Sequence, residues 1–281
     1  MEKIVVFGLG LIGGSMALSL KGKNRTFIGV DTDVNHTEQA LAFNLVDKIG
    51  NLEDVGDAAI VIIAVPVSYA PNLAVKILNK VAKNTLVFDV GSVKTSICEA
   101  VKLHQNRQQF VAAHPIAGTE FSGPSAAFNS LFTGKKNIIC EPKLSGTYFI
   151  EKALSLFDEL KMSTTFMKAK AHDKHIAYVS HLSHISSFML GKTVLEIEKD
   201  ESSIFTMAGS GFASTVRLSK SSPKTWTPIF LQNKKNILKS LEEYIKNLSQ
   251  FKELLVADNT EEIYKTMANT HHLKKILAEI K

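Results

Sequence analysis

Residues 3–15 read KIVVFGLGLIGGS, and this stretch decides the fold. Its first part is apolar and mostly β-branched, which is typical of a buried parallel strand. The glycines that follow fit the pattern G-x-G-x-x-G at Gly8, Gly10 and Gly13, and a helical pattern begins at about Ser15. A strand, a glycine turn and a helix in this order predict the first unit of a dinucleotide-binding domain.

Each glycine has its own physical task in such a turn. Gly8 lets the chain turn tightly, Gly10 lets the backbone approach a pyrophosphate, and Gly13 lets the helix pack closely on the strand. The free N–H groups at the helix N-terminus then face the anion. Asp31 ends the second apolar run and would bind the ribose hydroxyls. No Arg follows it to bind a 2′-phosphate, so NAD is favoured over NADP; the alternative is a glycine-rich turn that binds nothing.

Length, charge and cysteine content narrow the class of protein. A chain of 281 residues can bury a sizeable core and predicts two domains. The net charge is +6, but the basic residues form no long run, so nucleic-acid binding is not expected. The positive charge suits an anionic substrate or simply a solvated surface. Cys98 and Cys140 are far apart, which favours free thiols in a reducing compartment. Residues 4–20 lack charge, but four glycines interrupt them, so we expect a cytoplasmic protein with no membrane association.

Strand-like and helical patterns alternate as far as about residue 168. The expected strands cover residues 3–7, 26–30, 48–49, 58–65, 86–90, 110–114, 136–141 and 164–167. This alternation predicts a Rossmann-like, doubly wound parallel sheet with right-handed crossovers. The remainder is helical, with helices expected over 173–198, 228–257 and 261–281. We expect an NAD-binding domain at 1–168 and an all-helical substrate and dimerisation domain at 169–281. The apolar faces of its helices would be buried in a homodimer.

The carboxyl ends of the strands form the edge at which open α/β sheets bind ligands. His114 ends one strand, and Ser92 stands at the equivalent edge one strand earlier. Histidine is the commonest base for taking a hydroxyl proton, and Arg217 in the helical half suits a carboxylate. A purely structural histidine at the strand end is the alternative for His114. The residues expected to contact the cofactor are Gly8, Gly10, Leu11, Ile12, Gly13, Asp31, Val65, Pro66 and Gly91.

Several further histidines lie in the first long helix of the helical half. His181 and His184 share one helix face, but no third ligand is evident, so we expect no metal site. His181 is expected to pack in the interior or to support residues that contact the substrate, and not to bind a ligand directly. His172 and His175 are expected on the helix surface or at an interface. Trp226 is expected to anchor a core or an interface.

Four motifs, in this order, resemble the prephenate dehydrogenase family. They are the glycine turn at 8–15, Gly-Ser-Val-Lys at 91–94, His-Pro-Ile-Ala-Gly-Thr-Glu at 114–120 and Ser-His-Leu-Ser-His at 180–184. The resemblance covers nearly the whole chain. It implies an NAD-dependent enzyme that oxidises and decarboxylates prephenate to 4-hydroxyphenylpyruvate in tyrosine biosynthesis.

The resemblance also implies roles for individual residues. His114 would bond the ring hydroxyl and act as the base, and Ser92 would orient that hydroxyl beside the nicotinamide. His184 and Arg217 would hold substrate carboxylates, and Glu120 would stand at the mouth of the pocket as a polar gate. The residues expected to bind the substrate are Thr119, Glu120, His184 and Arg217.

The chain departs from the family pattern at three positions, which keeps alternatives open. Ser183 stands where many members have Pro, and Ala213 and Ser214 stand where many have a basic and an acidic residue. Arogenate, the transaminated relative of prephenate, is therefore an alternative substrate. A β-hydroxyacid dehydrogenase or imine reductase of the same architecture is a more distant alternative, although those enzymes usually place a catalytic Lys on the helical domain. A non-catalytic NAD-sensing module that uses the helical domain to bind a partner would leave Ser92, His114 and Arg217 without a purpose.

Overall fold

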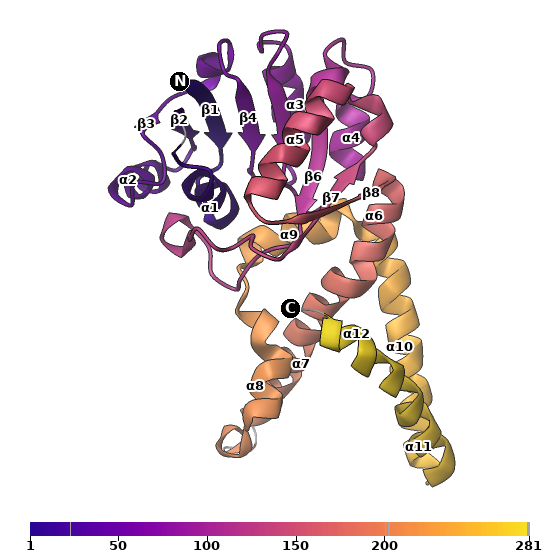
Figure 1. The fold of residues 1–281 in the computed structure, drawn as a ribbon. Helices are drawn as coiled ribbons and strands as arrows, with labels where there is room; N and C mark the ends of the chain where they lie inside the picture. Colours follow the sequence, from indigo (N-terminus) through magenta and orange to yellow (C-terminus); the bar gives the residue numbers. More distant parts are fainter. Residues whose placement is uncertain (23, 200, 202, 280–281) are drawn as a thin grey trace.

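The structure is a computed structural model that describes residues 1–22, 24–199, 201 and 203–279. Within this part of the chain, eight strands form one sheet in the order β3-β2-β1-β4-β5-β6-β7-β8 (Figure 1). The strands are β1 (Glu2–Phe7), β2 (Arg25–Val30), β3 (Lys48–Ile49), β4 (Ile60–Ile63), β5 (Leu86–Asp89), β6 (Phe110–Pro115), β7 (Lys136–Cys140) and β8 (Ser163–Met167). The central strand β1 pairs in parallel with β2 and β4, with Val5 opposite Ile28 on one side and Val61 on the other. The Rossmann-like, doubly wound architecture is therefore confirmed.

The expectation of an all-parallel sheet is wrong at one place. Strand β7 runs antiparallel to β6, with His114 opposite Ile138. Two parallel neighbours need a crossover connection, usually a helix. The segment 116–135 instead stays at the carboxyl edge of the sheet, where Phe128 N donates to Ser15 Oγ at 3.0 Å and Ser19 Oγ donates to Asn129 O at 2.7 Å. The chain therefore re-enters the sheet from the edge it has just left, and this loop packs against the helix that follows β1.

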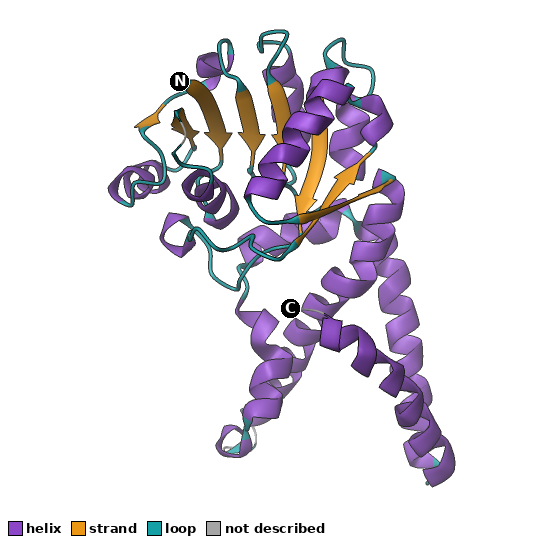
Figure 2. Cartoon of the chain, in the orientation of Figure 1, coloured by secondary structure: helices purple, strands orange, loops and turns teal. Residues whose placement is uncertain are grey.

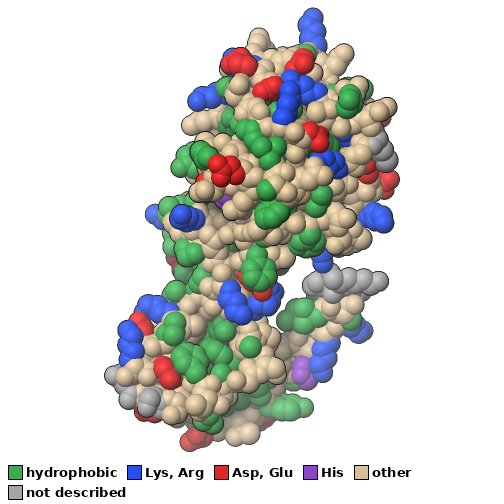
Figure 3. Space-filling view, turned by 90° about the vertical axis from the view of Figure 1, so that its left-hand side faces the viewer, with side chains coloured by type: hydrophobic (Ala, Val, Ile, Leu, Met, Phe, Trp, Pro, Cys, Tyr) green, Lys and Arg blue, Asp and Glu red, His purple; other side chains and the backbone are tan. Residues whose placement is uncertain are grey.

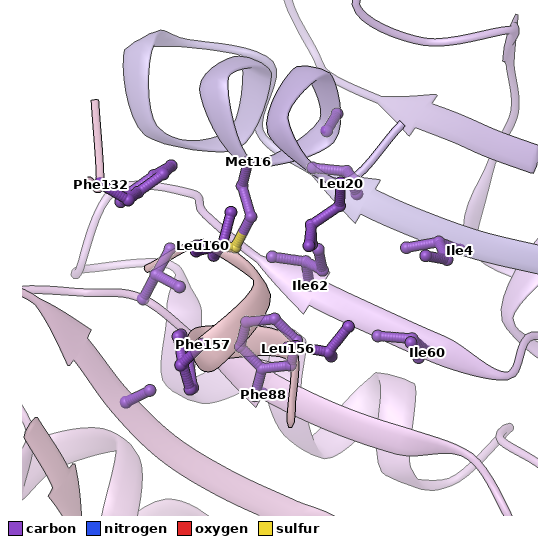
Figure 4. Close-up of a cluster of buried hydrophobic side chains, with 14 of the residues drawn as sticks. Ile4, Met16, Leu20, Ile60, Ile62, Phe88, Phe132, Leu156, Phe157 and Leu160 are labelled. Atoms are coloured by element: carbon purple, nitrogen blue, oxygen red, sulfur yellow. The ribbon is translucent and has the colours of Figure 1, made fainter. Parts of the chain in front are cut away.

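Helices cover both faces of the sheet (Figure 2). In the sheet domain they are α1 (Leu11–Ser19), α2 (Val34–Ala42), α3 (Ala70–Leu78), α4 (Thr95–Val101) and α5 (Thr147–Glu159). Side chains alternate along β1, so Ile4 and Val6 belong to one buried cluster and Val5 and Phe7 to the other. In the first cluster, side chains of α1 and α5 meet those of the strands (Figure 4). These two apolar layers hold the strand ends in place for the site.

The helical half begins where the sheet ends, because β8 stops at Met167 and the next helix starts at Ala169. The expected boundary between 1–168 and 169–281 falls at this point of the chain and stays a prediction; residues 280 and 281 lie outside the described residues. The helices are α6 (Ala169–Ile176), α7 (Leu182–Glu198), α8 (Ser210–Val216), α9 (Pro223–Gln232), α10 (Lys234–Val256), α11 (Thr260–Asn269) and α12 (Leu273–Glu279). Figure 1 shows two arms that project from the sheet, one with α7 and α8 and the other with α10 and α11, while α9 lies directly beneath the sheet.

Two helices that the sequence pattern predicts as continuous are interrupted. A π-helical turn, Ala177–His181, separates α6 from α7, and such turns often occur at functional sites. Asn233 separates α9 from α10, and its side-chain Nδ2 donates to Asp173 O at 2.7 Å and lies 3.2 Å from His181 Nδ1. Asn233, at the second break, therefore joins α9 and α10 to the π-turn through one buried polar contact.

The arms expose large apolar side chains, as the space-filling view shows on the lower part of the molecule (Figure 3). On α10, Ile237 is buried, but Ile245 and Leu248 are each 53% exposed and Leu255 is 54% exposed. None of the described helices is long and apolar enough to cross a membrane.

Candidate active site

The glycine turn after β1 shows why each glycine is needed. Gly8 has a φ of +90°, and a Cβ built on it would lie 2.4 Å from Ala64 O. A Cβ on Gly13 would lie 1.9 Å from Gly8 O. The close packing of α1 against the strand therefore requires a residue without a side chain at position 13. A Cβ on Gly10 would meet no atom within 4 Å. Gly10 therefore borders open space at the start of α1, where a pyrophosphate would fit.

The N-terminus of α1 and Asp31 complete the cradle. Gly10 provides no side-chain cap to α1, and the first turn of the helix holds no acidic side chain, so the positive end of the helix dipole faces the open space. Asp31 at the end of β2 accepts from Leu9 N at 2.8 Å and from Asp33 N at 2.9 Å. A carboxylate can accept about four hydrogen bonds, so Asp31 orders the turn and keeps capacity for a ribose. These groups fit a dinucleotide.

His114 lies at the carboxyl end of β6 and is only 8% exposed. Its Nδ1 is 2.7 Å from Nε2 of His172, and Nδ1 of His172 is 2.8 Å from Oδ1 of Asp173. Burial lowers the pKa of His114 well below its ordinary value of 6.5, and the charge of Lys94 lowers it further. His114 is therefore a neutral imidazole at neutral pH, which is the form that a general base requires.

Ser92 is carried by a turn that a buried ion pair anchors. Lys94 is fully buried and donates both to Asp89 at the end of β5 and to Ala113 O, at 2.6 Å, next to His114. The turn is fixed further by Gly91 N, which donates to Asp89 Oδ2 at 3.0 Å. These bonds tie the Ser92 turn to the two strands that end in the site, and Ser92 itself is half-buried.

The helical half contributes a second polar group. Nη1 of Arg217 lies 3.3 Å from Oε2 of Glu120 in the loop after β6. His184 stacks on Trp226 with ring centroids 3.4 Å apart, and its Nδ1 is 3.0 Å from Ser180 O. A carbonyl oxygen only accepts, so Nδ1 of His184 carries a proton and its Nε2 is the free nitrogen. Burial lowers the pKa of His184, and the nearby charge of Arg217 lowers it further.

A cavity of about 550 Å³ opens beside this ion pair, between the loop after β6 and the start of α9. Its lining residues are Glu120, Phe121, Ser122, Ser125, Ala126, Lys220 and Ser222. The loop that supplies most of them also packs on α1, through Phe128 N to Ser15 Oγ and Ser19 Oγ to Asn129 O.

Comparisons with known proteins identify the family. Residues 15–165 match the prephenate dehydrogenase nucleotide-binding domain, and residues 168–269 match the prephenate dehydrogenase dimerization domain. The chain belongs to the prephenate dehydrogenase family. The prephenate dehydrogenase of Bacillus subtilis is 28% identical over 270 residues, which is 94% of this chain and 73% of that protein.

Solved structures of this family have the same fold. The prephenate dehydrogenase of A. aeolicus, in complex with hydroxyphenyl propionate and NAD⁺, superposes with a TM-score of 0.89 and 29% identity, covering 99% of each chain. The arogenate dehydrogenase of Synechocystis superposes with a TM-score of 0.78 and 27% identity, covering 98% of this chain and 99% of that one. The chain is thus an NAD-dependent dehydrogenase with the fold of this family.

The site residues predicted from the sequence fall into two groups in the structure of this chain. His114 and the Ser92 turn meet at the sheet edge. On the side of the helical domain, Glu120 pairs with Arg217, whose charge acts on the nearby His184. Thr119 is exposed, and its Oγ1 accepts from Phe121 N at 3.2 Å. Leu11 and Ile12, also cofactor candidates, lie in the first turn of α1. The other candidates follow the ends of β4 and β5: Val65 is half-buried, Pro66 is exposed, and Gly91 precedes Ser92.

Of the two positions expected for His172, the helix surface or an interface, the structure excludes the surface. His172 is 1% exposed and contacts His114, while His175 on the same helix is exposed. Asp173, 2% exposed, was not singled out as a site residue from the sequence, yet its carboxylate meets His172. The sequence spacing indicates that both side chains are buried. Ala169, His172, Asp173 and Ile176 follow the i, i+3, i+4, i+7 spacing of one buried helix face.

His181 lies between the two groups. It is fully buried, and its ring contacts Trp226 with centroids 5.9 Å apart and Phe230 at 6.4 Å. Burial lowers the pKa of His181 to about 4, so its ring is neutral at neutral pH. Over the described residues, no three His, Cys, Asp or Glu side chains gather closely enough to hold a metal ion.

Proposed function

We propose that this chain oxidises and decarboxylates prephenate to 4-hydroxyphenylpyruvate with NAD, as a step of tyrosine biosynthesis. Membership of the family along nearly the whole chain supports this activity. The observation that carries it is the position of His114, a buried neutral imidazole at the same sheet edge as the glycine cradle. A base and a cofactor cradle at one edge are what oxidation of an alcohol requires.

The cradle residues would hold the cofactor. Gly10 and the N-terminal N–H groups of α1 would receive the pyrophosphate, and Asp31 would receive the ribose hydroxyls. Bound NAD would supply the hydride acceptor. Val65, Pro66 and Gly91 would line the path from the adenosine to the nicotinamide side, because they follow the carboxyl ends of β4 and β5.

His114 would take the proton of the ring hydroxyl as that hydroxyl becomes a carbonyl. Its Nε2 makes no hydrogen bond to any described residue, so this nitrogen is available to the substrate. Ser92, on the anchored turn, would orient the hydroxyl toward His114. Loss of CO₂ then makes the ring aromatic and drives the reaction, so the protein mainly supplies orientation, one base and anion-binding groups.

Arg217 and His184 would bind the substrate carboxylates, and Glu120 and Thr119 would stand at the entrance. The guanidinium of Arg217 can bind a carboxylate through two parallel hydrogen bonds, which Glu120 now partly engages. To donate to a carboxylate, His184 must bind a second proton, because its Nδ1 proton already goes to Ser180 O. An entering carboxylate would stabilise that imidazolium.

Arogenate is the second candidate substrate. The solved arogenate dehydrogenase of Synechocystis resembles this chain over almost its full length. In its neutral form, His184 presents an unprotonated Nε2, which can accept a hydrogen bond from the amino group of arogenate. The departures at Ser183, Ala213 and Ser214 lie in the same helical half.

We also infer a homodimer and a cytoplasmic location. The match of residues 168–269 to a dimerization domain and the exposed apolar side chains of α10 support the dimer. Cys98 and Cys140 are both buried and unpaired, which suits a reducing compartment.

The test is to measure NADH formation and CO₂ release by the purified chain with prephenate, arogenate and a β-hydroxyacid in parallel. NADH and CO₂ formed in equal amounts from prephenate, at a higher kcat/KM than from arogenate, are the expected result. A higher kcat/KM for arogenate would reassign the substrate, and turnover of the β-hydroxyacid alone would assign the chain to another class. NAD binding without turnover of any substrate would favour a sensing module.

A further inference from the structure

Three buried side chains form a line from the sheet edge into the helical domain. His114 ends β6, and His172 and Asp173 stand next to each other on α6. The line has two close contacts, 2.7 Å between the histidines and 2.8 Å from His172 to Asp173. The two imidazole rings meet edge-on, with an interplanar angle of 69°. Neither His172 nor Asp173 is needed to explain substrate binding, and both are almost fully buried.

The carboxylate fixes the direction of both hydrogen bonds. Burial alone would raise the pKa of Asp173, but hydrogen bonds from His172, Thr95 and Lys94 hold that pKa below its ordinary value, so Asp173 is ionised and only accepts. With one proton on each imidazole, His172 carries its proton on Nδ1, where it donates to Asp173, and its Nε2 is an acceptor. His114 must then donate from Nδ1, which leaves its own Nε2 unprotonated and free.

We propose that His172 and Asp173 are positioning residues that hold His114 in the tautomer with Nδ1 protonated and Nε2 ready to accept the substrate proton. The proposal deepens the function proposed above and rests on His114 being the base. The arrangement extends the logic of an Asp–His pair, in which the carboxylate selects the useful tautomer of the base, by one additional imidazole.

The surroundings of Asp173 hold the line in place from both domains. Its Oδ1 and Oδ2 accept from Lys94 N and Thr95 N, each at 2.8 Å, at the start of α4 in the sheet domain. Its backbone carbonyl accepts from Asn233 Nδ2 between α9 and α10. The orientation of the base therefore depends on how α6 of the helical domain is seated against the sheet domain.

The direct test is to locate the His114 proton by ¹⁵N NMR of histidine-labelled full-length protein at neutral pH, with the His114→Asn variant used for assignment. The proposal predicts a protonated Nδ1 and an unprotonated Nε2 in the wild type. In His172→Leu, a shift of population toward the Nε2-protonated tautomer is expected, and His172→Gln, whose amide oxygen can still accept from Nδ1, should restore the wild-type tautomer. A wild-type His114 protonated on Nε2, or on both nitrogens, would overturn the proposal.

Kinetics provide the second readout. We expect His172→Leu to lower kcat by about 10- to 100-fold, and Asp173→Asn by about 10²- to 10⁴-fold, as loss of the orienting carboxylate does in other histidine-based sites. The KM for NAD should stay unchanged, and His172→Gln should recover part of the loss. The matched control is His175→Leu, an exposed histidine on the same helix, which should keep the wild-type kcat.

The outcomes separate this proposal from the function on which it rests. A kcat of His172→Leu within about twofold of wild type would contradict the positioning role. Absence of turnover by the wild type with every substrate would contradict the proposed function, while the NMR measurement would still decide the tautomer. If Asp173→Asn fails to fold because Asp173 also caps α4, the wild-type spectrum and the His172 variants still decide.

Discussion

At the scale of single residues, the chemistry of His114 is set by its neighbours. Burial has the largest effect on its pKa, and the charge of Lys94 lowers that pKa in the same direction. A sequence shows that a histidine ends a strand, and this much was predictable. It does not show burial, a second imidazole at 2.7 Å or the Lys94 charge, because these contacts join residues that are far apart along the chain.

The lowered pKa of His114 leads to a prediction about pH. The base works only when it is neutral, and a lowered pKa keeps it neutral to more acidic pH. We expect kcat at saturating substrate to stay level from neutral pH to below 6.5, the ordinary pKa of histidine, and to fall only at more acidic pH. A pH–rate profile of kcat checks this, and an acidic inflection at or above 6.5 would contradict it.

Arg217 should act on binding more than on turnover. A hydrogen bond to a charged group contributes about 1.5–3 kcal/mol, so Arg217→Ala should raise the KM for substrate by about 10- to 100-fold and change kcat much less. Steady-state kinetics measure this, with Lys224→Ala, which removes an exposed cation of α9, as the control. An unchanged KM in Arg217→Ala would remove its assigned role.

At the scale of elements, the strands and most helices of the sheet domain were predictable, because local patterns define them. The glycine turn gave the order of strand, turn and helix, and the structure has β1 and α1 there. The antiparallel β7 and the breaks at the π-turn and Asn233 were not predictable. Each depends on contacts between distant segments, such as Phe128 with Ser15 and Asn233 with Asp173.

The glycine turn permits a prediction that separates binding from folding. Gly10→Ala adds a methyl group to open space, so the free energy of unfolding should fall by no more than about 1 kcal/mol, while NAD binding should weaken about tenfold or more. Gly13→Ala places the methyl group against Gly8 O and should cost about 1–3 kcal/mol of stability or more. Urea unfolding and NAD titration measure both quantities. Unchanged NAD affinity in Gly10→Ala would argue against the cradle.

At the scale of the whole molecule, the helical arms leave apolar surface uncovered. The face of α10 that packs inside the chain at Ile237 continues as exposed Ile245, Leu248 and Leu255. Large exposed apolar faces mark interaction sites, and a second copy of the chain is the occupant that we propose. The sequence pattern predicted the apolar face, but only the structure shows which part of it stays exposed.

The double variant Ile245→Lys with Leu248→Lys should therefore convert a dimer into a monomer, because two charges would have to be buried in the interface. Light scattering coupled to size exclusion gives the mass of each form. Lys246→Glu, at an exposed position of the same helix, is the control and should remain dimeric. A wild type that is monomeric at all concentrations would contradict the proposed homodimer.

The central claim is that His114 is the base of an NAD-dependent oxidation of prephenate. The most direct measurement compares NADH formation from prephenate by the wild type and by His114→Asn, with NAD affinity determined in parallel. We predict that kcat falls by about 10²- to 10⁴-fold while the Kd for NAD stays near the wild-type value. Equal turnover by the two proteins would contradict the account.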